Sequence, residues 1–247
     1  MYSVNSPGFA GGDRTSIELP QVQRDILKAL KKAGKKVVFV NCSGSAVALV
    51  PEMESCDAIL QAWYPGQAGG LAVADVLFGA FNPSGKLPVT FYKNTDQLPD
   101  FEDYSMKNRT YRYMTEVPLF PFGYGLSYTT FDISKGRLNK KTISAGQDLN
   151  FKVNVKNTGK YDGAEVIQVY VRKVDDAEGP IKSLRAFRRV PLKAGETCVV
   201  SIDLLPTTFE FFDPTTNTMR IMPGKYEIMY GNSSDIPSGN KLSVTLR

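Results

Sequence analysis

The segment Trp63–Phe91, WYPGQAGGLAVADVLFGAFNPSGKLPVTF, constrains the fold more than any other part of the sequence. It joins the end of an apolar strand to a glycine-rich turn, a small-residue helix over Gln67–Phe78, a loop and a second strand over Leu87–Phe91. A proline- and aromatic-rich strap, PLFPFGYGLSYTTF at Pro118–Phe131, closes this unit. Strands that alternate with helices are typical of α/β domains, whose helices cover a mainly parallel sheet.

The residues before this segment continue the α/β pattern. A helix is predicted to begin at Pro20 and to end at Gly34, since proline suits the first turn and glycine a helix end. Its apolar residues recur at helical spacing: Val22, Ile26, Leu30 and Ala33. Apolar runs over Lys36–Val40 and Ala58–Trp63 predict strands, the first of them buried on both faces. We therefore expect residues 1–117 to form an α/β three-layer sandwich with a mainly parallel sheet.

From Asp132 onward the pattern changes to short apolar runs separated by turn residues, without helical periodicity. The runs are Leu149–Val155, Val166–Arg172, Thr197–Leu205, Phe209–Phe212, Lys225–Tyr230 and Leu242–Leu246. This spacing predicts that residues 132–247 form an all-β immunoglobulin- or fibronectin type III-like sandwich. The strap, residues 118–131, is rich in proline, glycine and aromatic residues, which favours a packed connector over a flexible linker.

The chain of 247 residues contains no histidine. This excludes Ser-His and Cys-His nucleophilic catalysis and nearly every catalytic zinc arrangement, so we expect no metal site. Any catalysis by this chain would depend on carboxylates, Arg, Lys or Tyr. Carboxylates are the groups that glycoside hydrolysis uses. Three widely spaced cysteines, Cys42, Cys56 and Cys198, do not form a disulfide framework. Cys42 and Cys198 lie in or beside apolar runs and are interpreted as small core residues.

The net charge of +5 belongs to the second half of the chain, where it is spread over strand-like segments. The close basic group Arg185, Arg188 and Arg189 alternates with apolar residues like the outer face of a strand, so we expect no nucleic-acid partner. No apolar run approaches the roughly 18–20 residues that span a bilayer, so we expect no membrane partner. The first residues, MYSVNSPGFAGGDR, lack the features of a signal peptide. If the parent protein is periplasmic or secreted, its signal would lie upstream.

Together with GGDRTSIELP at residues 11–20, the segments Trp63–Phe91 and Pro118–Phe131 closely resemble the carboxyl-terminal half of family 3 glycoside hydrolases, which are β-glucosidases and β-xylosidases. The resemblance extends from about Pro7 to Ser234. It implies carbohydrate metabolism by a retaining, cofactor-free enzyme that hydrolyses O-glycosyl bonds of β-glucosides or β-xylosides. The implied partner is a β-linked oligosaccharide or glycoside.

The resemblance also implies that the catalytic groups lie elsewhere. In that family the nucleophilic aspartate belongs to an amino-terminal barrel domain, and the acid/base glutamate usually precedes the GGDR-like stretch. No acidic residue precedes Gly11, and Glu18 is interpreted as a helix-dipole partner. We therefore expect no catalytic residue in this chain, little activity in isolation and a missing barrel domain in cis. A homodimer through the exposed barrel-facing surface is a further hypothesis.

Several residues are candidates for binding substrate. The resemblance places Asp13 and Arg14 beside the sugar pocket, although an ion pair bracing the helix entry is an alternative. Trp63 ends a strand and could stack on a sugar ring, or belong to the core. A Tyr/Arg-rich stretch resembles one near the mouth of the family's active site: Tyr104, Arg109, Tyr111 and Arg112. Its alternative role is an aromatic ladder that packs a domain seam.

Two other functions compete with the enzyme hypothesis. One is a non-catalytic carbohydrate-binding module, and the other is a structural scaffold domain that packs against a partner. A scaffold would show a broad exposed apolar face on the α/β half of the chain.

Overall fold

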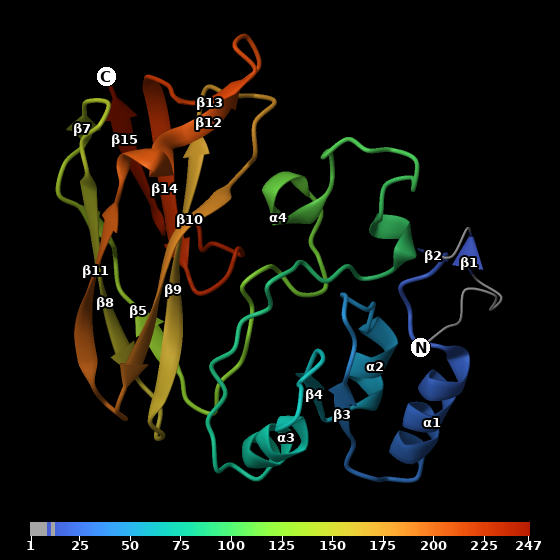
Figure 1. Ribbon diagram of the computed structural model, residues 1–247. Coiled ribbons are helices and arrows are strands. Elements are labelled where there is room, and N and C mark those ends of the chain that lie inside the picture. Colours follow the sequence, from blue (N-terminus) through green and yellow to red (C-terminus); the bar gives the residue numbers. More distant parts are fainter. Residues whose placement is uncertain (1–8, 11–12) are drawn as a thin grey trace. The chain divides into compact units, whose positions relative to one another are not determined.

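The computed structural model describes the backbone of residues 9–10 and 13–247, and side chains from Thr15 onward (Figure 1). The chain divides into two compact units, each described by itself below. Unit 1 comprises Met1–Ala80, Val89–Arg109 and Met114–Phe120, and unit 2 comprises Phe81–Pro88, Thr110–Tyr113 and Pro121–Arg247. Two short segments from the first half of the sequence, 81–88 and 110–113, are therefore grouped with the β-rich second half.

Unit 1 is built from short helices and strands. Its elements are β1 (Phe9–Ala10), β2 (Asp13–Arg14), α1 (Gln21–Lys32), β3 (Val38–Asn41), α2 (Val50–Ser55), β4 (Ala58–Gln61), α3 (Gly69–Leu77) and the 3-10 helix η1 (Thr95–Gln97). The strands β3 and β4 pair in parallel, and α2 lies in the connection between them. The predicted first helix is confirmed, and it ends before Gly34, which adopts the left-handed conformation at φ 70°.

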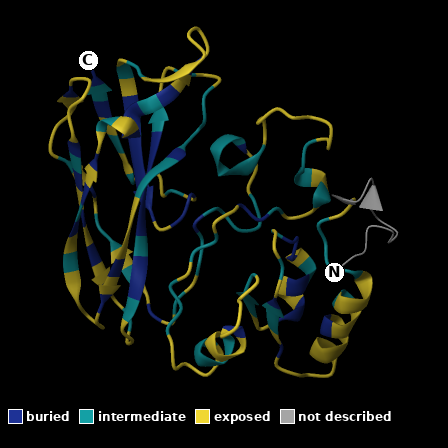
Figure 2. Cartoon of the chain, in the orientation of Figure 1, coloured by how far each residue is buried: buried dark blue, intermediate teal, exposed yellow. Residues whose placement is uncertain are grey.

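The apolar residues of α1 are much less buried than helical spacing would suggest. Val22, Ile26 and Leu30 are 65%, 55% and 41% exposed, and they follow one stripe of the helix. Leu27 is the buried residue of α1, where it packs with Val37 and Cys56. Figure 2 shows the same contrast, with most of α1 coloured as exposed. The helix α1 therefore presents a largely exposed apolar stripe among the described residues.

Three expectations for unit 1 are wrong in detail. The strand β3 is not buried on both faces, because Val38 is 48% exposed and β4 is the partner strand described for β3. The run Leu87–Phe91 does not form a strand, and Phe91 makes a single antiparallel bridge to Phe120 of the strap. Cys42 is exposed and not a core residue, because it follows the end of β3 at a turn.

Unit 2 contains most of the β structure. Its elements are the short helix α4 (Thr110–Tyr113), β5 (Phe131–Ile133), β6 (Arg137–Leu138), β7 (Thr142–Ile143), β8 (Leu149–Asn157), β9 (Gly163–Lys173), β10 (Ser183–Leu192), β11 (Thr197–Leu204), the 3-10 helix η2 (Pro206–Phe209), β12 (Glu210–Asp213), β13 (Thr218–Ile221), β14 (Gly224–Gly231) and β15 (Lys241–Leu246). One sheet has the strand order β10-β9-β14-β15-β7, and a second has the order β11-β8-β5, with β6 also paired to β8. The strands β12 and β13 form a separate two-stranded sheet. All of these pairs are antiparallel except β15 with β7.

The two larger sheets of unit 2 share one hydrophobic core. Alternate residues of β8 are buried, as the alternating sequence predicts, and Leu149, Phe151 and Val155 are fully buried. The central strand β9 contributes Ile167 and Val169 from the facing sheet, both fully buried. The predicted strands over 149–155, 166–172, 197–205, 225–230 and 242–246 are confirmed. Cys198 packs against the edge of this core, which agrees with its interpretation.

Candidate functional site

The parallel strands of unit 1 end in a group of polar side chains. Asn41 and Gln61 are paired in register at the carboxyl ends of β3 and β4, where Asn41 Nδ2 donates to Gln61 Oε1 at 2.6 Å. Asn41 Nδ2 also donates to Ser43 Oγ at 3.0 Å. Open α/β sheets place ligands at the carboxyl ends of their strands. In this chain the amides at that edge bond to one another, so the turn after β3 is held against β4.

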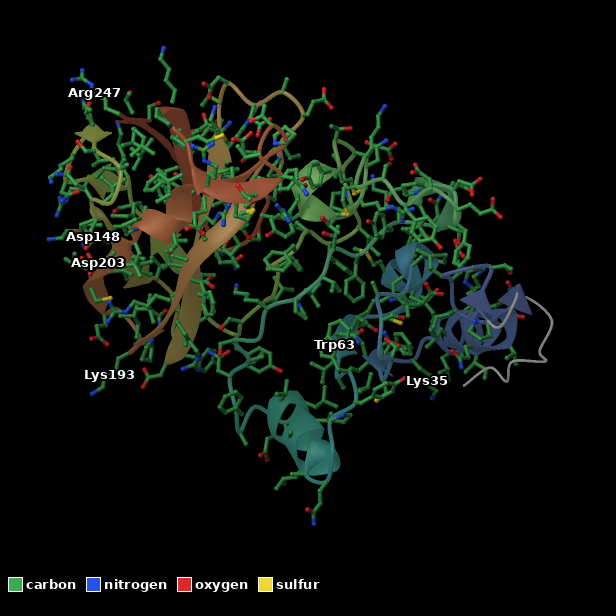
Figure 3. All side chains as sticks on the ribbon, turned by 45° about the horizontal axis from the view of Figure 1, so that its top comes forward. Lys35, Trp63, Asp148, Lys193, Asp203 and Arg247 are labelled. Carbon is green, nitrogen blue, oxygen red and sulfur yellow. The ribbon has the colours of Figure 1, made fainter. Side chains whose placement is uncertain are left out.

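Trp63 follows this edge and has an unusual backbone. Its φ is 55°, in the left-handed region that bulky residues rarely adopt, which costs on the order of 1–3 kcal/mol. The indole is half-buried and contacts Phe91 edge-on at 6.1 Å between ring centroids, and Phe91 contacts Phe120 in the same way. Trp63 is labelled in Figure 3. The aromatic contact supports a packing role, and stacking on a sugar remains a prediction.

A polar pocket of about 170 Å³ lies in unit 1, between the η1 segment and the loop before α4. Its lining residues are Asp96, Gln97, Leu98, Pro99, Asp103, Lys107, Asn108, Met114 and Glu116. Gln97 fixes one wall, because its Nε2 donates to Glu116 Oε2 at 3.0 Å and to the Val117 carbonyl at 3.2 Å. Ligand pockets usually occupy roughly 300–1,000 Å³, so this one could hold no more than a small polar group.

The loop around this pocket is braced from within by Arg109. Its guanidinium donates to the carbonyl oxygens of Ser105 at 3.0 Å, Asp100 at 3.1 Å and Asp103. The Asp103 carboxylate in turn accepts from the Ser105 amide at 2.8 Å. This backbone hydrogen bond is the main reason that the pKa of Asp103 is lowered. Arg109 therefore shapes the loop, while the ring of Tyr104 is 91% exposed beside the pocket residue Asp103.

Tyr111 and Arg112 belong to α4 in unit 2. The Tyr111 ring stacks on Phe122 with centroids 4.4 Å apart and meets Tyr170 edge-on at 5.7 Å. Its hydroxyl accepts a hydrogen bond from the Leu184 amide at 3.1 Å. Tyr111 is thus a packing residue of unit 2. Arg112 lies over the ring of Tyr113 at 5.6 Å.

The remaining candidates, Asp13 and Arg14, form β2, which pairs with β1 in antiparallel fashion. Their side chains lie outside the described part of the chain, so the predicted contact with sugar stays a prediction. Among the described side chains, no group of three or more His, Cys, Asp or Glu residues could hold a metal ion. No helix in the described residues is long and apolar enough to cross a membrane.

Glu18 has a role that the sequence did not reveal. It is not in the first turn of α1, which has no acidic residue, so the interpretation as a partner of that helix dipole is wrong. Its carboxylate instead accepts from the Thr95 amide at 2.9 Å and the Thr95 hydroxyl at 2.6 Å, where η1 begins. Burial raises the pKa of Glu18, but hydrogen bonds from Ser16 and Thr95 outweigh it and lower the pKa to about 2.

The architecture defines a class of protein in which an α/β part is followed by an all-β part. The family model for the glycosyl hydrolase family 3 C-terminal domain matches residues 3–128, and the fibronectin type III-like model matches residues 165–234. The chain belongs to glycosyl hydrolase family 3, of which it represents the carboxyl-terminal part.

Relatives and solved structures agree with this assignment. The chain is 61% identical to a xylan 1,4-beta-xylosidase of Xylanibacter ruminicola, covering 98% of this chain and 28% of the relative. It is 41% identical to a periplasmic beta-glucosidase of Salmonella typhimurium, covering 93% of this chain and 32% of the relative. A Listeria innocua beta-glucosidase structure in complex with isofagomine is similar with a TM-score of 0.82 at 32% identity, covering 96% of this chain and 34% of that one. The chain thus spans about a third of the length of these relatives.

Proposed function

We propose that this chain is the carboxyl-terminal part of a retaining β-glycosidase that acts on β-glucosides or β-xylosides. The observation that carries the proposal is the order of its two parts, a family 3 C-terminal domain followed by a fibronectin-like domain. Relatives named beta-xylosidase and beta-glucosidase match almost the whole chain and support this substrate class.

The chemistry of such an enzyme needs two carboxyl groups about 5–5.5 Å apart, one as nucleophile and the other as acid/base. In the family the nucleophile comes from a barrel domain, and we propose that this domain acts in cis. This chain would then border the substrate without supplying a catalytic carboxylate. On its own it would be inactive or nearly so.

An activity assay tests this proposal directly. The 247-residue chain and the longer protein encoded by the reading frame upstream of it are compared on aryl β-xyloside and aryl β-glucoside. We expect turnover by the longer protein and none above background by the chain alone. Turnover by the purified chain would show that the catalytic pair lies within it, and absence of turnover by the longer protein on both substrates would refute the glycosidase assignment.

A second candidate function is a non-catalytic carbohydrate-binding module. The small polar pocket of unit 1 and the exposed ring of Tyr104 favour it, since carbohydrate sites combine hydrogen-bonding groups with aromatic faces. Calorimetry with xylo- and cello-oligosaccharides measures whether the chain binds them. Binding that is lost in Tyr104→Ala would support it, and no heat at millimolar sugar would count against it.

We also propose the finer architecture and assembly. Residues 1–117 would form a three-layer α/β sandwich, with 118–131 as a packed connector and 132–247 as a β-sandwich. The parallel pair β3–β4 and the shared core of the two sheets in unit 2 support these descriptions. The exposed apolar stripe of α1 supports association, either with the rest of the protein or with a second copy.

A further inference from the structure

Two arginines of unit 2 are brought together by elements far apart in the sequence. Arg112 lies on α4, and Arg185 lies near the beginning of β10. Two hydrogen bonds hold α4 beside the beginning of β10: the Ile181 amide donates to the Arg112 carbonyl at 2.8 Å, and the Leu184 amide donates to the Tyr111 hydroxyl at 3.1 Å. The short helix α4 is thus docked along residues 181–184.

Neither arginine has an acidic partner. Among the residues that the structure describes, the ion pairs include neither guanidinium. Arg185 lies over the Phe211 ring at 4.8 Å and donates from Nη2 to the Glu210 carbonyl at 2.5 Å. Arg112 lies over the ring of Tyr113. Aromatic faces and one carbonyl supply partial negative charge, and the Glu210 carboxylate acts on Arg185 without forming an ion pair with it. Neither guanidinium therefore has a carboxylate in direct contact.

Three hydrogen-bond donors in this region are also left without an acceptor. Arg112 Nε, Arg185 Nε and Ser183 Oγ are shielded from solvent and have no hydrogen-bond partner. Ser183 is only 5% exposed. Buried donors without acceptors are rare and costly, most of all when they are charged. Burial lowers the pKa of Arg185, and the nearby charge of Arg112 lowers it further, while the charge of Glu210 opposes this shift without cancelling it.

We propose that Arg112, Arg185 and Ser183 form a binding site for a carboxylate, and that the ligand is the carboxylate group of an acidic sugar. Two guanidinium groups offer forked donors that match the two oxygens of a carboxylate, and the serine hydroxyl is a third donor. The basic excess in the second half of the chain would favour the approach of such an anion. The sugar part of this inference rests on the proposed function, which makes glycans the ligands that this chain would meet.

Calorimetry and thermal unfolding of the 247-residue chain test the site at constant ionic strength and low chloride. Glucuronate, glucose and inorganic phosphate serve as the probes. We expect glucuronate to bind at millimolar concentration and raise the melting temperature, and we expect glucose to do neither. Arg112→Gln should weaken glucuronate binding by about tenfold or more, because it removes one charged fork.

Matched variants separate recognition from folding. Arg188→Gln, on an exposed position of the same strand β10, should leave glucuronate binding unchanged. Arg112→Lys keeps the charge but loses the fork, so it should fold and still bind more weakly than the wild type. No binding of glucuronate, equal binding by Arg112→Gln, equal binding of glucose, or tighter binding of phosphate would each overturn the inference. Because these readouts are binding measurements, they are independent of whether the longer protein hydrolyses β-glycosides.

Discussion

At the residue scale, Glu18 links the segment before α1 to the beginning of η1. Its folded pKa of about 2 lies below the usual value near 4.3, so its stabilising contribution is complete above about pH 4.5 and is lost as the pH falls towards 2. Because Glu18 is partly exposed, we expect this contribution to be only about 1 kcal/mol. Glu18→Gln should therefore lower the stability of unit 1 at pH 7 by that amount and make it less sensitive to acid between pH 4.5 and 2.

The measurement can use Trp63, the single tryptophan of the chain, which belongs to unit 1 and packs on Phe91. Urea unfolding followed by its fluorescence reports on unit 1 alone. Glu54→Gln, at an exposed position of α2, serves as the control and should leave the transition unchanged. Equal acid sensitivity of Glu18→Gln and the wild type would contradict the role assigned to Glu18.

A second residue-scale prediction concerns the ion pair of Lys86 with Glu165 in unit 2. The Nζ–Oε1 distance is 2.7 Å, and the two side chains are only 12% and 7% exposed. Glu165 also accepts from the Val166 amide and from Asn232 Nδ2. Lys86→Met would leave a buried carboxylate without its counter-charge, so we expect a loss of about 3–5 kcal/mol in the free energy of unfolding.

Chemical unfolding followed by far-ultraviolet circular dichroism measures this loss. Lys160→Met, at an exposed position of unit 2, is the control. The double variant Lys86→Met with Glu165→Leu should lose less than Lys86→Met alone, because no charge is then left unpaired. A double variant that is less stable than Lys86→Met would contradict the proposed origin of the effect.

At the scale of elements, the segment 81–88 is built into unit 2 by hydrogen bonds. Asn82 Nδ2 donates to the Asp162 carbonyl at 2.8 Å, and its Oδ1 accepts from Ser127 Oγ and from the Tyr128 amide. Near its other end, the Leu87 amide donates to the Tyr124 carbonyl at 2.8 Å. The β-rich unit therefore includes residues that precede the strap by several tens of positions.

Asn82→Ala tests this integration. Loss of three hydrogen bonds should destabilise unit 2 by about 1–3 kcal/mol, seen as an earlier unfolding transition in circular dichroism. Asn154→Ala, an exposed residue on β8, is the matched control and should change stability by less than about 0.5 kcal/mol. If both variants unfolded alike, the segment 81–88 would be peripheral to unit 2.

The same elements show what the sequence could and could not predict. Alternating apolar residues predicted β8, because a strand with one face on a core repeats every second residue. They also predicted β9, although residues 167–171 of this strand are all buried. The strand β10 was recognised only by its arginines, since a register shift between Leu184 and Ala186 interrupts its alternation. The run Leu87–Phe91 has strand-like composition, yet its ends bond to the strap instead of to another strand.

The candidate site was predictable only in part, because its geometry depends on contacts between segments that are distant in the sequence. Tyr111 and Arg112 were identified by residue type, but their packing against β10 depends on a tertiary contact between distant segments. Likewise, the acceptor for the Thr95 amide is Glu18, which no local pattern links to it. Local periodicity carries no information on such pairings.

At the scale of the whole molecule, the apolar stripe of α1 is the feature that bears most on association. Val22, Ile26 and Leu30 remain 41–65% exposed, and a stripe of this kind on a soluble protein marks a surface that another chain segment or molecule covers. We expect the 247-residue chain to self-associate through α1 at high concentration. Ile26→Lys should shift it towards the monomer, since lysine favours helix and charges the centre of the stripe.

Light scattering at increasing protein concentration gives the molar mass that decides this prediction. Gln21→Lys adds the same charge at an exposed position of α1 on the side away from the stripe, so it should associate like the wild type. In the longer protein proposed above, the part that corresponds to the remaining two thirds of the relatives' length would cover the stripe, and Ile26→Lys should then lower stability instead of changing mass. A wild-type chain that stays monomeric at every concentration would refute self-association, because its exposed apolar stripe would then be tolerated in water.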